Sequence, residues 1–181
     1  MWLTGAKNKM STLLVTFTYS FNGVEDEKSF DLEGGQTAND IKEEIAESLI
    51  DQHEPEEDED EEFEPTASDI ELLSCECDEN VSAEYLTIDK IFDFADTFCE
   101  CDQNVDVVEA AIYCGIDGSD IDEAFAGAFD SDEDFARDMA DQLGAIDKNA
   151  TWHQTCIDWE IAAKELMYDY SEHNGYYFRN M

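Results

Sequence analysis

Apolar side chains alternate with threonine and serine near the start of the chain, from Leu13 to Phe21. This period of two is typical of a strand with one buried face and one exposed face. Asn22-Gly23 follows and favours a tight turn, after which Ser29–Leu32 supplies a return strand. The pattern therefore predicts an amino-terminal β-hairpin.

A helix is predicted directly after this hairpin. Gly34-Gly35 interrupts the chain, and Thr37 with Asp40 has the spacing of a helix cap. An apolar stripe then continues at helical spacing to about Asp51, with glutamates on the other side. The stripe is Ile41, Ile45 and Leu49, and the glutamates are Glu43, Glu44 and Glu47.

The middle of the chain predicts one short strand followed by helices. The apolar run Ile70–Cys77 is typical of a strand. Helical spacing predicts helices over 83–98, over 104–113 with Gly115 at its end, and over 119–126. Their inward residues are Ile88, Ile91, Phe92, Ala95 and Phe98, then Val105, Val108 and Ile112, then Ile121 and Phe125.

A further helix begins after Ser131, which has the side chain of an N-cap, and ends before Gly144. Phe135, Met139 and Leu143 recur every four residues and define its inward side. Carboxylates occupy the other side, roughly 5–6 Å apart along the axis at ~1.5 Å per residue. Successive phosphates of a DNA strand are about 6–7 Å apart, given a ~3.4 Å rise per base. These carboxylates are Asp132, Asp134, Asp138 and Asp141.

The chain closes with a helix and a strand. Asp158 is the expected cap of a helix that buries Trp159, Ala163 and Leu166 and runs to about Tyr170. Asn174-Gly175 turns the chain into a strand over 176–178.

Together these elements predict an α+β protein. We divide it into a hairpin-and-helix domain over 10–53, a mainly helical middle domain over 66–115 and an α/β carboxy-terminal domain over 116–181. The segment 54–65 between the first two contains nine acids and two prolines and is expected to be an acidic linker. Met10 is a possible true start, with residues 1–9 a leader.

Charge is the dominant property of the 181-residue chain: 48 acids face 9 bases, a formal net charge of -39. Residues 1–53 carry -6, 54–65 carry -9, 66–115 carry -12 and 116–181 carry -12, so every part is acidic. Such a surface repels nucleic acid and anionic membranes and attracts basic grooves. The total equals the charge of about 20 base pairs of duplex DNA, at one charge per ~1.7 Å. Adaptation to a salty cytoplasm is the alternative explanation.

Nothing in the sequence favours catalysis or a metal site. Asp130 to Asp141 has acids at several calcium-loop positions, but Phe135 replaces the required glycine. Cys75-x-Cys77 and Cys99-x-Cys101 lack the usual zinc spacing and have acidic neighbours, so we expect reduced, apolar thiols. The histidines are isolated and no catalytic motif occurs. We therefore expect no enzymatic activity, no cofactor and no metal. Without an export signal or an apolar span, a cytoplasmic location is expected.

Three stretches of the carboxy-terminal part resemble the ArdA-type antirestriction proteins of phages, plasmids and transposons. They are Glu123–Met139, Cys156–Leu166 and Gly175–Phe178. The resemblance is best over about 116–179 and looser from about 70, through the strand and Ser82–Tyr85. The amino-terminal part is divergent.

The resemblance implies an elongated, commonly dimeric chain of three small subdomains that imitates bent B-form DNA. Such proteins occupy the DNA-binding groove of a Type I restriction–modification complex in the bacterial cytoplasm and inhibit it. Dispersed carboxylates do the work, and the matching ones are Glu123, Asp130, Asp132, Glu133, Asp134, Asp138, Asp158, Glu160 and Glu165. The alternative is an acidic chaperone, or an inhibitor of another basic DNA-binding protein or defence nuclease.

Overall fold

The computed structural model describes residues 12–53, 63–146 and 156–181 of the chain. It has the predicted α+β composition, with helices and two small antiparallel sheets. The chain divides into two compact units, an amino-terminal unit up to Asp106 and a carboxy-terminal unit from Val107 onward. Each unit has its own sheet and its own buried aromatic residues.

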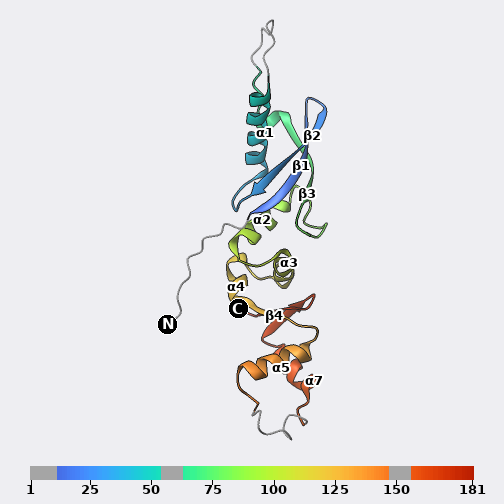
Figure 1. Ribbon diagram of the computed structural model, residues 1–181, viewed down its shortest axis with the longest axis vertical. Coiled ribbons are helices and arrows are strands. Elements are labelled where there is room, and N and C mark those ends of the chain that lie inside the picture. The colour runs from blue at the N-terminus through green and yellow to red at the C-terminus, as the bar shows by residue number, and fades with distance from the viewer. Residues whose placement is uncertain (1–11, 54–62, 147–155) are drawn as a thin grey trace, which may run out of the picture. The chain divides into compact units, whose positions relative to one another are not determined.

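The amino-terminal unit is built on a three-stranded sheet of order β2-β1-β3 (Figure 1). Its strands are β1 (Leu13–Phe21), β2 (Val24–Leu32) and β3 (Ile70–Cys77). The predicted turn joins the first two: Asn22 and Gly23 both have positive φ, at 51° and 79°. Such angles suit a turn that follows the strand twist. The predicted hairpin and the strand over 70–77 are confirmed, although the return strand is longer than expected.

Helix α1 (Ala38–Gln52) contacts β3 and carries the predicted capping box. The Asp40 amide donates to Thr37 Oγ1, and Asp40 Oδ2 accepts from the Thr37 amide at 2.7 Å. Ile41 and Ile45 are fully buried, together with the inward side chains of β1. Those side chains are Leu13, Val15 and Phe17.

The predicted division at 54–65 does not separate two domains. Strand β3 pairs with β1 along most of its length, so both flanks of this segment belong to one unit. The rings of His53 and Phe63, which border residues 54–62, stack with centroids 4.2 Å apart. Residues 54–62 themselves lie outside the described residues. The observed division, between Asp106 and Val107, also differs from the predicted one between 115 and 116.

Helix α2 (Ile91–Glu100) begins later than the predicted residue 83. Short turns replace its first part, and the Ile91 amide makes the first helical bond, to the Thr87 carbonyl at 2.9 Å. Phe94 is 1% exposed and occupies the core position, whereas Phe92 is only half-buried. The 3-10 turn η1 (Ala67–Asp69) precedes β3.

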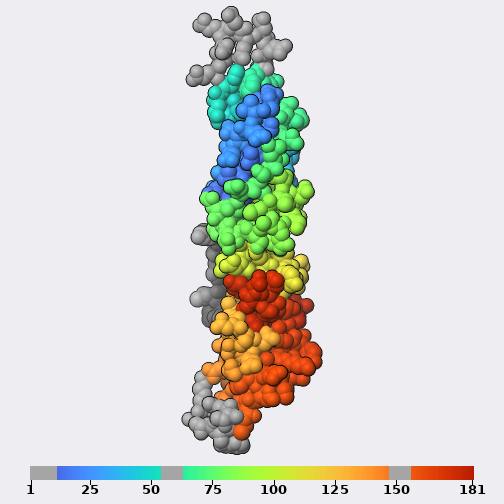
Figure 2. All heavy atoms as spheres, turned by 90° about the vertical axis from the view of Figure 1, so that its right-hand side faces the viewer, coloured from blue at the N-terminus to red at the C-terminus, as the bar shows by residue number. Residues whose placement is uncertain are grey.

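The carboxy-terminal unit contains a second three-stranded sheet, of order β4-β6-β5. Helices α5 and α7 contact each other in the same unit. In Figure 2 the last residues of the chain, in dark red, are at the surface of this unit. Its elements are α3 (Val105–Cys114, which spans the division), η2 (Gly118–Asp120), α4 (Ile121–Ala124), β4 (Phe125–Ala128), α5 (Asp132–Gln142), α7 (Trp159–Leu166), β5 (Tyr170–His173) and β6 (Tyr176–Arg179).

Strands β4 and β5 were not predicted. The expected helix over 119–126 ends at Ala124, because Phe125 pairs with Phe178 of β6. The last helix ends at Leu166 instead of Tyr170, and Tyr170 starts β5. Strand pairing overrides local helix propensity at both places, with a distant segment for Phe125 and within the β5–β6 hairpin for Tyr170.

The aromatic core of this unit is centred on Phe135, which is fully buried. Its ring centroid lies 4.5 Å from that of Tyr177 and 5.1 Å from that of Phe129. The predicted helix from Ser131 is confirmed, and Gly144 has a φ of 63° just past its end. Leu143, however, is 74% exposed and lies outside the core.

Candidate acidic binding surfaces

Helix α5 presents its carboxylates on a firmly started first turn. Ser131 Oγ accepts a hydrogen bond from the Asp134 amide at 3.2 Å and donates to Asp134 Oδ2 at 2.9 Å. Asp132, Glu133 and Asp134 all stand in this turn, where negative charge is favourable because the backbone amides point outward. One N-cap residue, Ser131, therefore stabilises the turn that holds all three acidic residues.

Arg137 forms ion pairs with two of these carboxylates within the same helix. Its guanidinium donates to Asp134 Oδ1 at 2.8 Å and to Glu133 Oε2 at 3.4 Å, and it lies 5.4 Å from the ring centroid of Trp159 at the start of α7. These groups are about half exposed, so each ion pair contributes roughly 0–1 kcal/mol. Two carboxylates are therefore partly neutralised within the chain.

Asp132 connects the surface to the core. The buried Tyr177 hydroxyl donates to Asp132 Oδ1 at 2.7 Å. Burial, followed by the hydrogen bond and charge of Asp132, raises the pKa of Tyr177 above its ordinary 10.0. The phenol is therefore a fixed donor at neutral pH, and it holds the Asp132 carboxylate at the surface.

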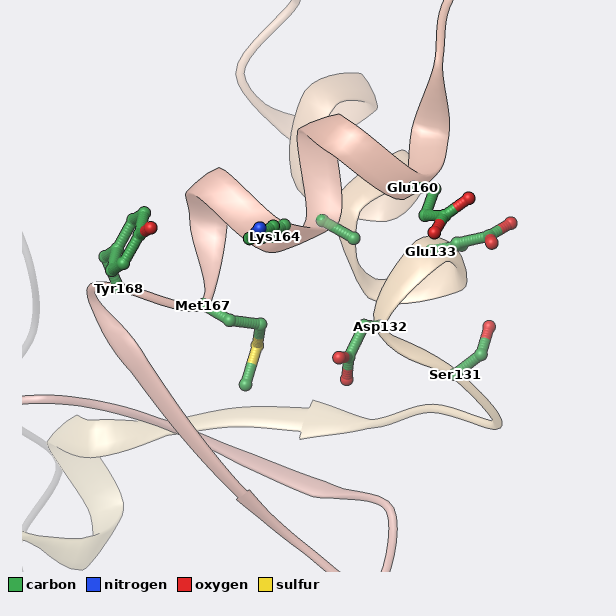
Figure 3. A pocket seen from close by; sticks show the side chains of 8 residues that line it. Ser131, Asp132, Glu133, Glu160, Lys164, Met167 and Tyr168 are labelled. Carbon is green, nitrogen blue, oxygen red and sulfur yellow. The ribbon is translucent and has the colours of Figure 1, made fainter.

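A cavity of about 590 Å³ opens beside the start of α5, between that helix and α7 (Figure 3). Asp132, Glu133 and Glu160 lie at one end, Tyr168 lies at the other, and Met167 lies between them. The remaining lining residues are Ser131, Ala163 and Lys164. The cavity thus combines an acidic end with an apolar floor.

The structure distributes the nine predicted site residues over the carboxy-terminal unit. Only Asp132, Glu133 and Glu160 meet, at the cavity. Asp138 accepts from Gln142 Nε2 at 2.6 Å, and Asp158 caps α7 by accepting from the Ile161 amide at 3.1 Å. The other acids are exposed and line no part of this cavity: Glu123, Asp130, Asp134 and Glu165.

The amino-terminal unit has an acidic surface of its own, which we name the sheet face. It is the side of the β2-β1-β3 sheet opposite the buried side chains Val15 and Phe17. On β1 it shows Leu14, Thr16, Thr18 and Ser20, whose partners on β2 are Asp31, Ser29, Glu27 and Glu25. On β3, Thr16 pairs with Glu76, Thr18 with Ser74 and Ser20 with Glu71. Carboxylates therefore flank a row of small polar side chains on both sides.

A β-bulge brings the two β3 carboxylates onto one side. Glu71 and Glu76 are five residues apart, and an unbroken strand would place them on opposite faces. The register shifts between Thr18 and Tyr19, which adds one residue to β3 and restores the shared face. Lys28 lies on the other side, with Nζ 5.2 Å from the centre of the Phe30 ring.

The spacing of the sheet face compares well with that of DNA. Alternate residues of a strand are ~7 Å apart at ~3.4 Å per residue, close to the phosphate spacing along one DNA strand. Strands β2 and β3 are two strand spacings apart, or roughly 10 Å. That separation falls between the ~6 Å minor groove and the ~12 Å major groove of B-DNA.

Sequence reasoning missed the sheet-face acids, although one signal for them was visible. In β2 the residues Glu25, Glu27, Ser29 and Asp31 alternate with inward positions. The β3 contribution had no such signal, because nothing local in the sequence marks the bulge.

The remaining cysteine and histidine side chains are better explained by packing than by catalysis or metal binding. Burial, with a smaller effect of Cys77, raises the pKa of the Cys75 thiol to about 11, so this thiol is neutral at pH 7. His173 stacks on Tyr113 with centroids 3.7 Å apart, and His153 lies outside the described residues. Among the described residues, no group of three or more His, Cys, Asp and Glu side chains is arranged to hold a metal ion. No helix in the described ranges is long and apolar enough to cross a membrane.

Comparison of the chain with protein-family models, with curated proteins and with solved structures gave no match.

Proposed function

We propose that the chain is a DNA-mimic antirestriction protein. It occupies the DNA-binding groove of a Type I restriction–modification complex in a bacterial cytoplasm and inhibits the enzyme without catalysis of its own. The observation that carries the proposal is the sheet face, where ordered strands hold carboxylates about one or two phosphate spacings apart along each strand. The resemblance of the carboxy-terminal part to ArdA-type proteins supports the same conclusion.

The burial pattern supports a role for charge in binding. No charged side chain of the described residues is buried, so the acids of both units reach solvent. Net charge this far from zero opposes compaction, and a partner with a basic groove offsets that cost. Electrostatic steering makes such association fast and sensitive to salt.

Recognition is distributed in this proposal. Exposed ion pairs contribute little one at a time, so affinity arises from many carboxylates acting together. The chain needs no cofactor, and it binds the enzyme as a homodimer, as the resemblance implies.

A competition assay tests the proposal. Purified Type I enzyme is mixed with the chain and with increasing duplex DNA, and DNA cleavage and enzyme-bound chain are measured at several salt concentrations. We expect DNA to displace the chain and salt to weaken its binding. Binding that duplex DNA in excess does not displace would contradict the proposal, and preferential binding to isolated basic proteins would favour an acidic chaperone.

A further inference from the structure

We propose that the cavity between α5 and α7 receives an arginine side chain of the protein partner. This inference rests on the proposed function, because it assigns one contact within the acidic surface that the partner covers. It differs from the distributed mechanism because it predicts one contact that contributes more to binding than the other carboxylates do individually.

The cavity matches arginine in both shape and charge. The floor is apolar, formed by Ala163, which is 3% exposed, and by the half-buried Met167. Three methylene groups of an arginine stem fit such a floor, which removes apolar surface from water. A volume of about 590 Å³ leaves room for the whole side chain.

The acidic end provides acceptors for the guanidinium. Asp132, Glu133 and Glu160 converge there from two helices (Figure 3). Asp132 is fixed by Tyr177, and Glu133 lies 3.4 Å from Arg137. Glu160 is therefore the carboxylate most open to a new partner. Carboxylates bind the planar fork of arginine in a bidentate manner, which a lysine ammonium does not reproduce.

Lys164 also lines the cavity, and its positive charge opposes the binding of an arginine. Its side chain is exposed and lies along the wall, and its charge repels a cation. The three carboxylates outnumber it, so the net charge of the cavity remains negative. Because a lysine side chain is long and flexible, its ammonium turns to solvent at little cost when a guest enters.

The first test measures dissociation of the chain from the restriction enzyme. Glu160→Gln removes a cavity carboxylate, and Asp169→Asn removes an exposed one from the same unit that neither lines the cavity nor belongs to the nine predicted site residues. We expect about a tenfold faster dissociation for Glu160→Gln and less than a twofold change for Asp169→Asn. Equal effects of the two variants would overturn the inference and leave the distributed mechanism standing.

A second pair of variants keeps the charge constant. Ala163→Leu fills the cavity, whereas Ala162→Leu adds the same group at a position that does not line it. We expect roughly tenfold weaker binding for Ala163→Leu alone, with thermal unfolding measured for both chains to verify folding. Binding that Ala163→Leu leaves unchanged in a folded chain would also overturn the inference.

A third measurement needs no restriction enzyme, so it separates failure of the inference from failure of the proposed function. The full chain is titrated with N-acetyl-arginine amide and with N-acetyl-lysine amide while backbone amide signals are followed by NMR. We expect arginine to shift the Ala163 and Met167 signals several-fold more than lysine, and Glu160→Gln to abolish the difference. Equal shifts would reduce the cavity to a general cation site and overturn the proposal. Self-association that Glu160→Gln removes would assign the cavity to a second copy of the chain instead, which also contradicts it.

Discussion

The sheet face of the amino-terminal unit and the first turn of α5 in the carboxy-terminal unit both present carboxylates, but the two sets are held differently. On the sheet face, the strand register alone fixes the acids, and the only basic residue of β2 lies on the other side. On α5, Asp132 and Asp134 also accept hydrogen bonds that hold the fold together. Acids of the first kind are free to serve a partner, whereas acids of the second kind serve both purposes.

The largest expected effect concerns the core beneath α5. Phe135→Ala removes a fully buried ring that contacts Phe129, Tyr170 and Tyr177, and we expect a loss of about 3–5 kcal/mol in unfolding free energy. Leu143→Ala in the same region is the control and should cost under about 0.5 kcal/mol, because Leu143 is 74% exposed. Urea denaturation measures both. Similar losses for the two variants would show that the core is centred elsewhere.

The second prediction tests the sheet face itself. Joint replacement of Glu27, Asp31 and Glu76 by their amides should weaken inhibition about a hundredfold, or roughly 2.8 kcal/mol at about 1.4 kcal/mol per tenfold. The fold should survive, since these side chains are exposed. The matched control neutralises Glu43, Glu44 and Glu47, three exposed acids on α1, and should change inhibition only a few-fold. Equal losses from both triple variants would mean that total charge matters and position does not.

This contrast also explains what the sequence was able to predict. Strong periodicity located β1, α1 and α5, and the caps Thr37, Ser131 and Asp158 were read correctly from side-chain type and spacing. Strand β4 escaped because it is four residues long and depends on pairing with β6, far away in the sequence. Strand β5 is equally short and forms a hairpin with β6 through the Asn174-Gly175 turn, but the helical pattern of α7 was extended over its first residue, Tyr170. The helix start at residue 83 was wrong because short turns compete with a helix there.

The candidate sites show the same contrast between local sequence patterns and long-range contacts. The α5 acids were predictable because a helix places residues three or four apart on one side. Glu71 and Glu76 were not, since their shared face depends on a bulge that appears only in the register with β1. The convergence of Glu160 with Asp132 likewise depends on the packing of α7 against α5. Local sequence patterns determine where helices and strands form. The pairing and packing of those helices and strands determine which of their side chains come together.

The third prediction uses pH to compare the two units. Burial raises the pKa of Tyr177 and, to a smaller extent, that of Tyr19 in β1 above the ordinary 10.0. The neutral phenols therefore stabilise the fold fully below about pH 10, and this contribution is lost as the pH rises above 10. The slope is at most about 1.4 kcal/mol per pH unit for each phenol.

Tyr177→Phe and Tyr19→Phe separate the two contributions. Each variant lacks one ionisable phenol, so each should lose less stability than the parent chain between pH 9 and pH 11. The difference should be larger for Tyr177→Phe, because the pKa of Tyr177 is raised further than that of Tyr19. Urea denaturation at each pH measures it. Curves that stay parallel to that of the parent chain would contradict the predicted shifts.

The prediction with the smallest expected effect distinguishes recognition of carboxylates at fixed positions from recognition of net charge alone. Ser131→Ala removes the acceptor of the Asp134 amide and should cost about 1 kcal/mol of stability with no change in charge. If the partner recognises carboxylates at fixed positions, fraying of this first turn should weaken inhibition less than fivefold but measurably. Thr37→Ala is the matched control: it removes the corresponding cap from α1, whose acids lie off the sheet face, and should cost similar stability while leaving inhibition unchanged. A chain that bound through net charge alone would inhibit equally well with either cap removed, because neither replacement alters that charge.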